Sequence, residues 1–475
     1  MHVFYQGLDG TAGNNYCLGF PGYFGTLKQQ TMKSAIRTSD SSPDPQQINK
    51  TNITRKDFLS KTTRLVTIGT AGSMLLTGSL GGDADAQTPG KNSTPIDDKP
   101  IVLEQWKSDV DQQSGPVPTP LPPERRIGYA VVGLGHLSLE EIIPALFSCK
   151  KSKLAALVSG SPEKMIKVAS QYGVSPQNCY SYQTYDQLKN NKEVDVIYIV
   201  LPNGMHKEYV VRGAKAGKHI LCEKPMANTA AECREMIDAC NKANVKLMIA
   251  YRIQYQPHNR KLRDMVQNKE FGIAKFVEAS NCQSSANPDH WRHKIKLAGG
   301  GALPDIGLYC LNTTRFVLGE EPTEVFAYQY STPGNPLFTE VEEMVSWQMR
   351  FPSGVVASCS THYNVHESRH YRVLCEKGWM NMDKAYAYKG QQLSSAKASG
   401  RLELQQNIGL AEKNQFATEM DHFSECIINN KTPYTPGEEG LQDHILMEAI
   451  YKSAKEGKPV KLAAGIVVAK GPEPD

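Results

Sequence analysis

Short apolar runs alternate with amphipathic stretches over residues 125–250 of the chain. The apolar runs have the length of buried strands and comprise Ile127–Val132, Leu154–Val158, Val194–Val200, His219–Leu221 and Val245–Ala250. Segments with helical periodicity lie between them, at Leu139–Cys149, Lys207–Ala216 and Ala230–Ala243. Because strands alternate with helices, this region predicts a doubly wound α/β domain with a parallel sheet.

The pattern changes near Tyr251-Arg252, where longer alternating segments follow one another without long helices between them. The expected strands are Ile273–Asn281, Glu324–Tyr330, Glu343–Phe351, Val355–Thr361 and Tyr371–Glu376. They predict an α+β domain over residues 251–465 with a large, mostly antiparallel open sheet, one face of which helices or another subunit can cover. Two helices are expected at Glu412–Asn429 and Glu438–Lys455, the second stopped by Gly457 and Pro459, and residues 466–475 form a tail.

Residues 1–86 read as an extension that carries an export signal. Thr54–Leu59 precedes a weakly apolar run, Leu65–Leu80, and a small-x-small cleavage site at Ala84-Asp85-Ala86. The arrangement resembles a twin-arginine signal with cleavage near Ala86, except that Lys56 replaces the second arginine. We therefore expect a periplasmic protein without a stable membrane anchor, because the apolar run is short for a membrane span. If the segment is instead an amphipathic helix or a tail, the protein is cytoplasmic.

Residues 87–124 are polar and rich in proline. Proline fixes φ and has no N–H, so this segment is expected to stay extended. It can be a linker, which the sequence alone slightly favours, or an arm that reaches over a neighbouring subunit.

Composition narrows the classes of partner. The 475 residues include 53 basic and 49 acidic side chains, for a net charge of +4, and no basic stripe interleaved with aromatics, so nucleic acid is not expected as a partner. The 11 cysteines lack the spacing of a zinc site, and no metal is expected.

A glycine turn joins the first expected strand to the first expected helix. Gly133 permits the tight turn, Gly135 lets the backbone approach a pyrophosphate, and the small Ser138 stands in place of a third glycine. The helix N-terminus then faces the anion. This strand, turn and helix are typical of a Rossmann dinucleotide-binding domain, whose turn residues would be Gly133, Leu134, Gly135, His136 and Leu137.

The second strand ends in Ser159-Gly160-Ser161, followed by Lys164, where an NAD-preferring site would have an acid for the ribose diol. Without a carboxylate to repel a 2′-phosphate, hydroxyls and an ammonium would accept it, so the sequence favours NADP over NAD. If Lys164 is only a solvated residue of the next helix, the preference stays open.

Further candidate residues follow the next two strands. Leu201, Pro202, Asn203 and His206 fall at the carboxyl edge of the sheet, where cofactor ribose and substrate are within reach. His206 could act in catalysis, but its place at the head of a helix favours a role near the nicotinamide ribose. The strand after it leads into Glu223-Lys224-Pro225, which places Lys224 where such sheets bind ligands.

Asp305 and Tyr309 follow a glycine run, Ala298–Ala302, and share one face of the expected helix. A free tyrosine has a pKa of about 10 and is a weak base at neutral pH unless a cation stabilises its phenolate. Lys224 is the expected cation. Removing a hydride from a carbinol carbon requires that the hydroxyl proton be taken at about the same time, which Tyr309 assisted by Lys224 can do.

These motifs together resemble the glucose-fructose oxidoreductase group, or the similar aldose-aldose branch, of the Gfo/Idh/MocA oxidoreductases. The similarity spans residues 125–460 and rests on Arg125–Tyr129, Ser159–Lys164, Cys222–Ala227, Tyr251-Arg252, Trp291-Arg292, Ala298–Gly319 and Pro436–Gly440. Much of the wider family has histidine where this chain has Tyr309. His136 and Leu137 fill the glycine turn differently from the branch.

The resemblance implies Lys224, Asp305 and Tyr309 as the catalytic group, Arg252 near the sugar, and Glu223, Arg252, Trp291 and Arg292 in the cofactor site. It also implies tightly held NADP, oxidation of an aldose at C1 to a lactone, and reduction of a second sugar, fructose or an aldose, to the alditol. Members are exported folded and form a homodimer or homotetramer in which the arm embraces a neighbour. Because no nicotinamide pool is regenerated outside the cytoplasm, a second sugar would have to reoxidise a bound cofactor.

Two alternatives remain at the level of sequence. One is an NAD(P)-dependent aldose or inositol dehydrogenase that exchanges its cofactor. The other is an NAD-dependent glycosidase or an inactive sugar-binding relative, against which the presence of Lys224, Asp305 and Tyr309 argues.

Overall fold

The computed structural model describes residues 102–111, 115, 117–466 and 468–474. The expected export signal, within residues 1–86, lies outside the described residues, as does part of the proline-rich arm. The two sheets described below belong to one compact unit.

The first sheet has six strands in the order β3-β2-β1-β4-β5-β6, and every neighbouring pair is parallel. Its strands are β1 (Ile127–Val132), β2 (Ser152–Val158), β3 (Cys179–Tyr180), β4 (Val196–Ile199), β5 (His219–Glu223) and β6 (Leu247–Ala250). The chain adds β2 and β3 on one side of β1 and then β4, β5 and β6 on the other side, which is the order of a doubly wound nucleotide-binding sheet. The predicted α/β class is therefore confirmed.

The helices around this sheet are α2 (Ile143–Leu146), α3 (Pro162–Tyr172), α4 (Asn203–Lys215) and α5 (Ala230–Lys242), with short turns η1 (Pro123–Arg125), η3 (Pro176–Asn178) and η4 (Tyr185–Asn190). The regular helix expected from Leu139 to Cys149 is wrong in detail. A π-helical segment, η2 (Ser138–Ile142), precedes the short α2. Pro144 explains the change, because it lacks the N–H that an α-helix would direct to residue 140. Helix α4 begins four residues before the expected Lys207, directly after Pro202.

The second sheet has nine strands in the order β14-β13-β12-β11-β7-β10-β9-β8-β15. Only β7 and β10 pair in parallel within it, so the expected mostly antiparallel sheet is confirmed. Its strands are β7 (Ala274–Ser284), β8 (Glu324–Tyr330), β9 (Met344–Arg350), β10 (Val356–His362), β11 (Asn364–Cys375), β12 (Gly378–Asp383), β13 (Gln392–Ser399), β14 (Leu402–Ile408) and β15 (Val460–Lys461).

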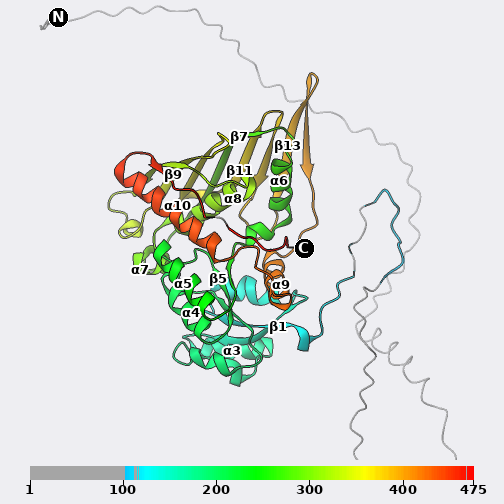
Figure 1. Ribbon diagram of the computed structural model, residues 1–475, viewed down its shortest axis with the longest axis vertical. Helices are drawn as coiled ribbons and strands as arrows, with labels where there is room; N and C mark the ends of the chain where they lie inside the picture. The colour runs from blue at the N-terminus through cyan, green and yellow to red at the C-terminus, as the bar shows by residue number, and fades with distance from the viewer. Residues whose placement is uncertain (1–101, 112–114, 116, 467, 475) are drawn as a thin grey trace, which may run out of the picture. The chain divides into compact units, whose positions relative to one another are not determined.

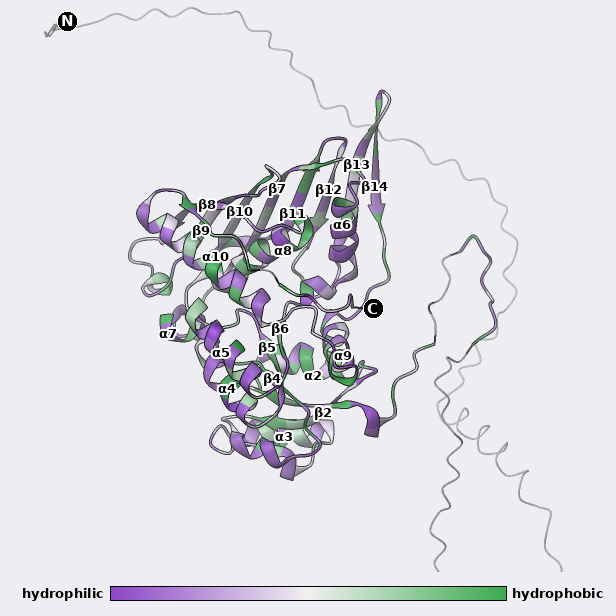
Figure 2. Ribbon diagram, in the orientation of Figure 1, coloured by the Kyte–Doolittle hydropathy of each residue, from purple (hydrophilic) through white to green (hydrophobic). Residues whose placement is uncertain are grey.

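Strands β12 to β14 were not expected from the sequence. Strand β14 is almost wholly exposed, so its side chains carry no burial pattern, and Figure 2 shows many hydrophilic positions along it. With β13 it forms a hairpin that projects beyond the other strands (Figure 1).

Helices cover one face of this sheet and join it to the first. They are α6 (Pro257–Gln267), α7 (Ile295–Ala298), α8 (Leu308–Leu318) and α10 (Gly437–Glu456), with turns η5 (Arg252–Tyr255), η6 (Trp291–His293), η7 (Leu303–Gly307) and η8 (Pro336–Phe338). Helix α6 was missed because polar residues occupy many of its positions, including the buried His258, Asn259 and Arg263. Helix α10 packs against β8 of the second sheet and against α5, a helix of the first domain.

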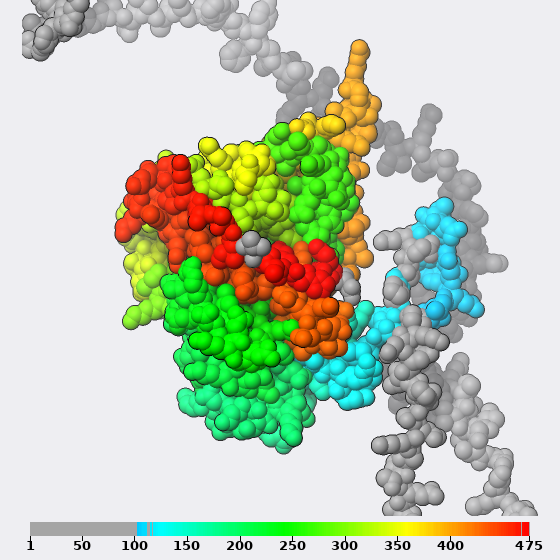
Figure 3. All heavy atoms as spheres, in the orientation of Figure 1, coloured from blue at the N-terminus to red at the C-terminus, as the bar shows by residue number. Residues whose placement is uncertain are grey.

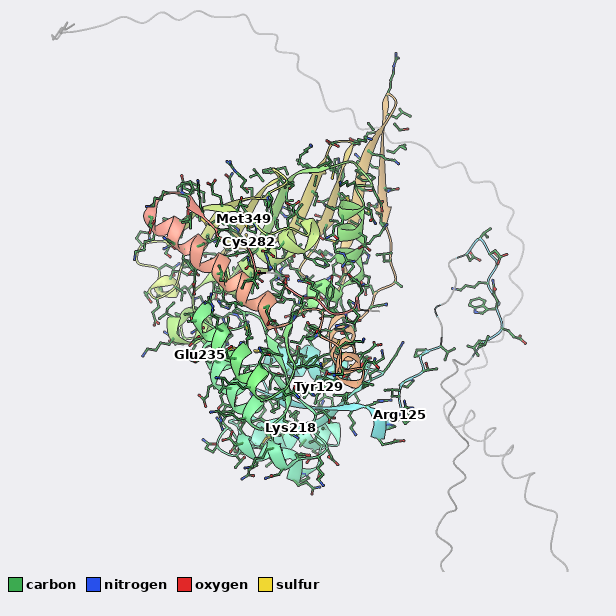
Figure 4. All side chains as sticks on the ribbon, viewed as in Figure 1. Arg125, Tyr129, Lys218, Glu235, Cys282 and Met349 are labelled. Atoms are coloured by element: carbon green, nitrogen blue, oxygen red, sulfur yellow. The ribbon has the colours of Figure 1, made fainter. Side chains whose placement is uncertain are left out.

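Helix α9 (Gln415–Ile428) comes from the second half of the chain but packs on the nucleotide-binding domain, beside α2 and β2. The Tyr129 hydroxyl of β1, labelled in Figure 4, donates to the Met420 carbonyl at 2.8 Å. The Asp421 carboxylate accepts from the backbone N–H groups of Lys150 and Lys151 at 2.6 and 2.8 Å. Figure 3 shows the orange atoms of α9 between cyan atoms from near the start of the domain and the red C-terminal segments.

The described part of the proline-rich arm joins the first domain at its end. The Leu121 N–H donates to the Lys150 carbonyl at 2.8 Å, and Arg126 Nε donates to the Leu121 carbonyl at 2.7 Å. Further upstream, Val102, Leu103, Trp106 and Val110 are exposed. Among the described helices, none combines the length and apolar character needed to cross a membrane.

Candidate active site

A cavity of about 660 Å³ lies where the carboxyl ends of β1, β2, β4 and β5 face the second domain. Of the residues proposed from the sequence, those that line it are Gly133, Leu134, Gly135, His136, Leu137, Ser159, Gly160, Ser161, Lys164, Leu201, Pro202, Asn203, Glu223, Lys224, Arg252, Trp291, Arg292, Asp305 and Tyr309. The fold thus gathers residues that are up to 176 positions apart, from Gly133 to Tyr309, around one space.

The glycine turn after β1 is built for close approach. Gly133 has a φ of 95°, and a Cβ atom there would lie 2.3 Å from the Val200 carbonyl oxygen, so no other residue fits without a shift. The buried Ser138 hydroxyl donates to the Gly133 carbonyl at 2.6 Å and fixes the turn. A Cβ at Gly135 would meet nothing within 4 Å, so the backbone there faces open space. This cradle fits the pyrophosphate of a dinucleotide.

The loop after β2 supplies polar groups next to that cradle. The Ser161 N–H donates to the Ser159 hydroxyl at 3.1 Å, and Lys164 Nζ donates to the Leu134 carbonyl at 3.2 Å. Lys164 is therefore tied to the glycine turn rather than only solvated. The Tyr182 ring packs so closely on Gly160 that a Cβ there would lie 2.9 Å from it.

Asn203 and His206 both lie on α4, but only Asn203 lines the cavity. Its side-chain amide donates to the Ala298 carbonyl at 2.8 Å and so links α4 to the second domain. His206 is fully buried behind the cavity wall, with Nδ1 2.9 Å from the Pro225 carbonyl oxygen and Nε2 2.8 Å from the Leu201 carbonyl oxygen. The structure therefore does not place His206 in the cofactor cavity; it tethers the two loops that carry Leu201 and Lys224.

Asp305 lies in the π-helical turn η7 and is almost fully buried. Its Oδ2 accepts from Arg292 Nε at 2.8 Å and from the Tyr363 hydroxyl, while Oδ1 lies 3.6 Å from Lys224 Nζ. Burial alone would raise the pKa of Asp305, but the charges of Arg292 and Lys224 outweigh it and hold that pKa well below its usual range. The group is therefore a fixed carboxylate and not a proton acceptor at neutral pH.

Tyr309 is held between two cations. Lys224 Nζ lies 4.6 Å from the centre of its ring, and the Arg252 guanidinium carbon lies 4.8 Å from it. The described hydrogen bond to the Tyr309 hydroxyl comes from Arg252 Nε, at 3.2 Å, whereas Lys224 Nζ donates to the Asp305 carbonyl oxygen at 2.8 Å. The sequence predicts Lys224 as the nearby cation that favours the phenolate. Lys224 packs on the Tyr309 ring, and the described hydrogen bond to the phenol oxygen comes from Arg252 Nε.

Arg252 is buried and uses its whole guanidinium. Nη1 donates to the Gln415 side-chain oxygen at 2.7 Å and to the Ala387 carbonyl at 3.3 Å, and Nη2 donates to the Tyr386 carbonyl at 2.7 Å. These partners come from helix α9 and from the segment after β12. The arginine that contacts Tyr309 is therefore oriented by two distant parts of the chain.

Glu223, at the end of β5, accepts a hydrogen bond from the Tyr198 hydroxyl at 2.8 Å. Burial raises the pKa of its carboxyl, although Lys224 and Arg252 lie nearby and favour the charged form. Among the described residues, no three His, Cys, Asp or Glu side chains gather as a metal ion requires.

Several lining residues were not found from the sequence. They comprise Tyr182, Val200, Asn281, Gln283, His290, Ile306, Arg369, Tyr386, Tyr388 and Phe416. Most come from the second domain, where neither spacing nor a motif connects them to the glycine turn. His290 was the most accessible to sequence reasoning, since it precedes Trp291-Arg292.

A nucleotide cradle that opens onto a tyrosine hydroxyl and a fixed carboxylate defines the class of a dinucleotide-dependent oxidoreductase. Residues 127–251 match the family described as "Oxidoreductase family, NAD-binding Rossmann fold", and residues 259–381 match the "GFO/IDH/MocA C-terminal domain". The chain belongs to the GFO/IDH/MocA oxidoreductase family.

Three similar proteins illustrate the relationship. D-xylose 1-dehydrogenase [NADP(+)] of Haloarcula marismortui is 30% identical over 342 residues, which are 71% of this chain and 93% of the relative. The 1,5-anhydro-D-fructose reductase of Ensifer adhaerens is 26% identical over 71% of this chain and 99% of its own length. The crystal structure of aldose-aldose oxidoreductase from Caulobacter crescentus complexed with glycerol superimposes with a TM-score of 0.69 and 42% identity, covering 71% of this chain and all of that one.

Proposed function

We propose that this protein is an NADP-dependent sugar oxidoreductase that oxidises an aldose at C1 to the lactone and reduces a second sugar to the alditol while holding its cofactor tightly. The observation that carries the proposal is the Tyr309 hydroxyl, bonded to Arg252 and flanked by Lys224, in the same cavity as the glycine cradle. The 42% identity to an aldose-aldose oxidoreductase, over the whole of that chain, supports the exchange between two sugars.

The choice of NADP rests on the loop after β2. Residues 159–161 contribute two hydroxyls and no carboxylate, and Lys164 stands beside them on the same wall of the cavity. An acid that binds a ribose diol would repel a 2′-phosphate, whereas hydroxyls and an ammonium stabilise it. The name of the D-xylose 1-dehydrogenase of Haloarcula marismortui, which specifies NADP(+), supports the same choice.

The chemistry divides between cofactor and protein. A nicotinamide bound in this cavity would supply the hydride chemistry, and the protein would bind and orient the sugars and move the proton. As a phenolate, whose negative charge the cations Arg252 and Lys224 stabilise, Tyr309 takes the proton of the reacting hydroxyl and becomes neutral. When the second sugar is reduced, Tyr309 returns the proton, so the first sugar loses two hydrogens and the second gains them.

Asp305 has a separate task. Two donors, Arg292 and Tyr363, share its Oδ2, while Oδ1 has Lys224 at 3.6 Å as its nearby charged group. A carboxylate has about four acceptor positions, so Oδ1 retains capacity for a sugar hydroxyl. Asp305 thus orients the sugar and leaves proton transfer to Tyr309.

The test uses the purified protein without added cofactor. Incubation with glucose and fructose, or with a single aldose, should yield aldonate and alditol in equal amounts, and denaturation should release about one NADP(H) per chain. Tyr309→Phe should lose most turnover and retain the nucleotide. An enzyme that purifies empty and needs added NADP would instead be a dehydrogenase that exchanges its cofactor.

We also propose that the protein is exported and forms a homodimer or homotetramer. The signal-like segment ending near Ala86 supports export, and the exposed apolar side chains of the arm, together with the broad second sheet, support assembly. N-terminal sequencing of the native protein should find its first residue near Gln87. Light scattering should give two or four times the mass of the cleaved chain, which is 52.5 kDa minus the mass of the signal. A native start before Thr54 would exclude cleavage, and a monomer would exclude assembly.

A further inference from the structure

The wall of the cavity that belongs to the second sheet carries a row of polar side chains from β7 and β11. Asn281 and Gln283 lie on β7, and Arg369 of β11 pairs directly with Asn281 across the ladder. The Asn281 amide donates to the Ile306 carbonyl at 2.9 Å, which places Asn281 beside the turn that carries Asp305. Arg369 is therefore one strand, about 5 Å, further from that turn than Asn281.

Arg369 lies on the inner face of the sheet. Side chains two positions apart on a strand point to the same face, and Tyr371, two residues later, is buried and donates to the Asn259 side chain of α6 at 2.8 Å. The Arg369 side chain, 26% exposed, continues this otherwise buried face at the point where the cavity begins. A cation on an inward face is costly unless it has an anionic partner.

The other cations at this end of the cavity already have partners, anionic for Lys224 and Arg292 and neutral acceptors for Arg252. Lys224 and Arg292 share the Asp305 carboxylate, and Arg252 makes four hydrogen bonds. The ion pair described for Arg369 is with Glu367, at 2.9 Å, and the Glu367 side chain is 58% exposed. The Arg369 hydrogen bond to Gln283 is long, at 3.4 Å.

The pair with Glu367 is readily replaced. An exposed ion pair contributes little, because water screens it and both side chains lose freedom. The register of β11 against β7 also shifts between Asn364 and Ser368, so Glu367 lies in an irregular stretch. A carboxylate or phosphate that entered the cavity could take the guanidinium in a bidentate geometry at low cost.

We propose that Arg369, with Gln283 beside it, forms a subsite for an anionic group at the end of the sugar remote from the reacting carbon. The enzyme then favours acidic sugars, such as hexuronates or hexose phosphates, over neutral ones. This inference rests on the proposed function for the position of the reacting carbon, next to Tyr309 and Asp305, but the subsite itself is defined by β7 and β11.

The test compares glucose, glucuronate and glucose 6-phosphate as donors and, separately, as ligands in calorimetry. One charge-assisted contact corresponds to a factor of about ten in kcat/KM, so at least one acidic sugar should exceed glucose by that factor. Arg369→Gln should lower kcat/KM for that acidic sugar about tenfold and so remove the preference. Glu367→Gln should strengthen the binding of the acidic sugar, because it removes the competing carboxylate. Arg372→Gln, on the same strand but three residues on and so on the other face, is the matched control and should leave the preference intact.

Equal values for acidic and neutral sugars in the wild type, or a preference that survives Arg369→Gln, would overturn the subsite. The two acidic sugars distinguish a carboxylate site from a phosphate site. If no sugar is oxidised, the proposed function fails, while calorimetric binding of glucuronate or glucose 6-phosphate that depends on Arg369 still supports the subsite.

Discussion

Replacing Arg252 by lysine separates charge from geometry in the contact to Tyr309. Arg252 makes four hydrogen bonds, of which those to Gln415 and to the Tyr386 carbonyl are 2.7 Å long. A lysine ammonium keeps the charge but lacks the rigid fork, so we expect about two of these bonds to be lost. At about 1.5–3 kcal/mol for each bond to a charged group, Arg252→Lys should lower the free energy of unfolding by about 3–6 kcal/mol.

The catalytic effect should be larger than stability alone explains. Without Arg252 Nε at 3.2 Å, the Tyr309 hydroxyl loses its described donor, and we expect turnover per bound cofactor to fall by about 100-fold, the lower range for loss of acid–base catalysis. Turnover with a saturating aldose, normalised to released nucleotide, measures this effect, and urea unfolding measures stability.

Gln415→Ala provides the matched control, because it removes a partner of the same guanidinium without touching Tyr309. It should lose stability but retain turnover within about threefold, since the three hydrogen bonds that it removes, to Arg252 and to the Ala387 and Tyr388 carbonyls, do not involve Tyr309. Wild-type turnover in Arg252→Lys would refute the contact to Tyr309 as a catalytic one. An equal loss of turnover in both variants would mean that the arginine acts only through the fold.

Three further outcomes are expected. Gly133→Ala should purify without nucleotide, as judged after denaturation, since its Cβ would lie 2.3 Å from the Val200 carbonyl oxygen; full occupancy would contradict this. Because the pKa of Asp305 is depressed, its ion pairs stabilise the fold above the ordinary carboxyl range, and this stability is lost as pH falls through that range. Asp305→Asn should therefore weaken the pH dependence of the free energy of unfolding below about pH 4. An unchanged pH dependence in that range would count against the ion pairs. Burial lowers the pKa of His444 from 6.5 to about 3, so the free energy of unfolding of the wild type should fall as pH drops from 6.5. In urea titrations at several pH values, His444→Gln should reduce the slope of this free energy against pH by up to about 1.4 kcal/mol per pH unit. Equal slopes would speak against a buried neutral imidazole.

The parts of the site that follow strands directly could be predicted from the sequence. Gly133, Ser159, Asn203 and Lys224 each come within a few residues of a strand end, and parallel strands bring their carboxyl ends to one edge. The same reasoning failed for His206, because α4 starts earlier than expected and directs the His206 ring into the core. There the two ring nitrogens lie within hydrogen-bond distance of the Pro225 and Leu201 carbonyls.

The second-domain wall could not be predicted in this way. Arg369 reaches the cavity through the register of β11 against β7, and the hydrogen bond from Arg252 to Tyr309 depends on Gln415 and on the Tyr386 carbonyl. Such contacts are set by tertiary packing, which leaves no periodic signal in any one segment. For the same reason the sequence indicated Lys224 as the cation beside Tyr309 but placed Arg252 only near the sugar, although both lie beside the ring.

The placement of α9 makes the nucleotide-binding half dependent on the end of the chain. A nascent polypeptide that stops after β6 has all six parallel strands, yet the Tyr129 hydroxyl lacks its acceptor at Met420 and the Lys150 and Lys151 amides lack Asp421. During synthesis from the N-terminus, domains usually fold as they emerge, but here the first domain cannot finish before residue 428 is made. A fragment cut at residue 250 lacks α9 and should therefore bind the cofactor poorly.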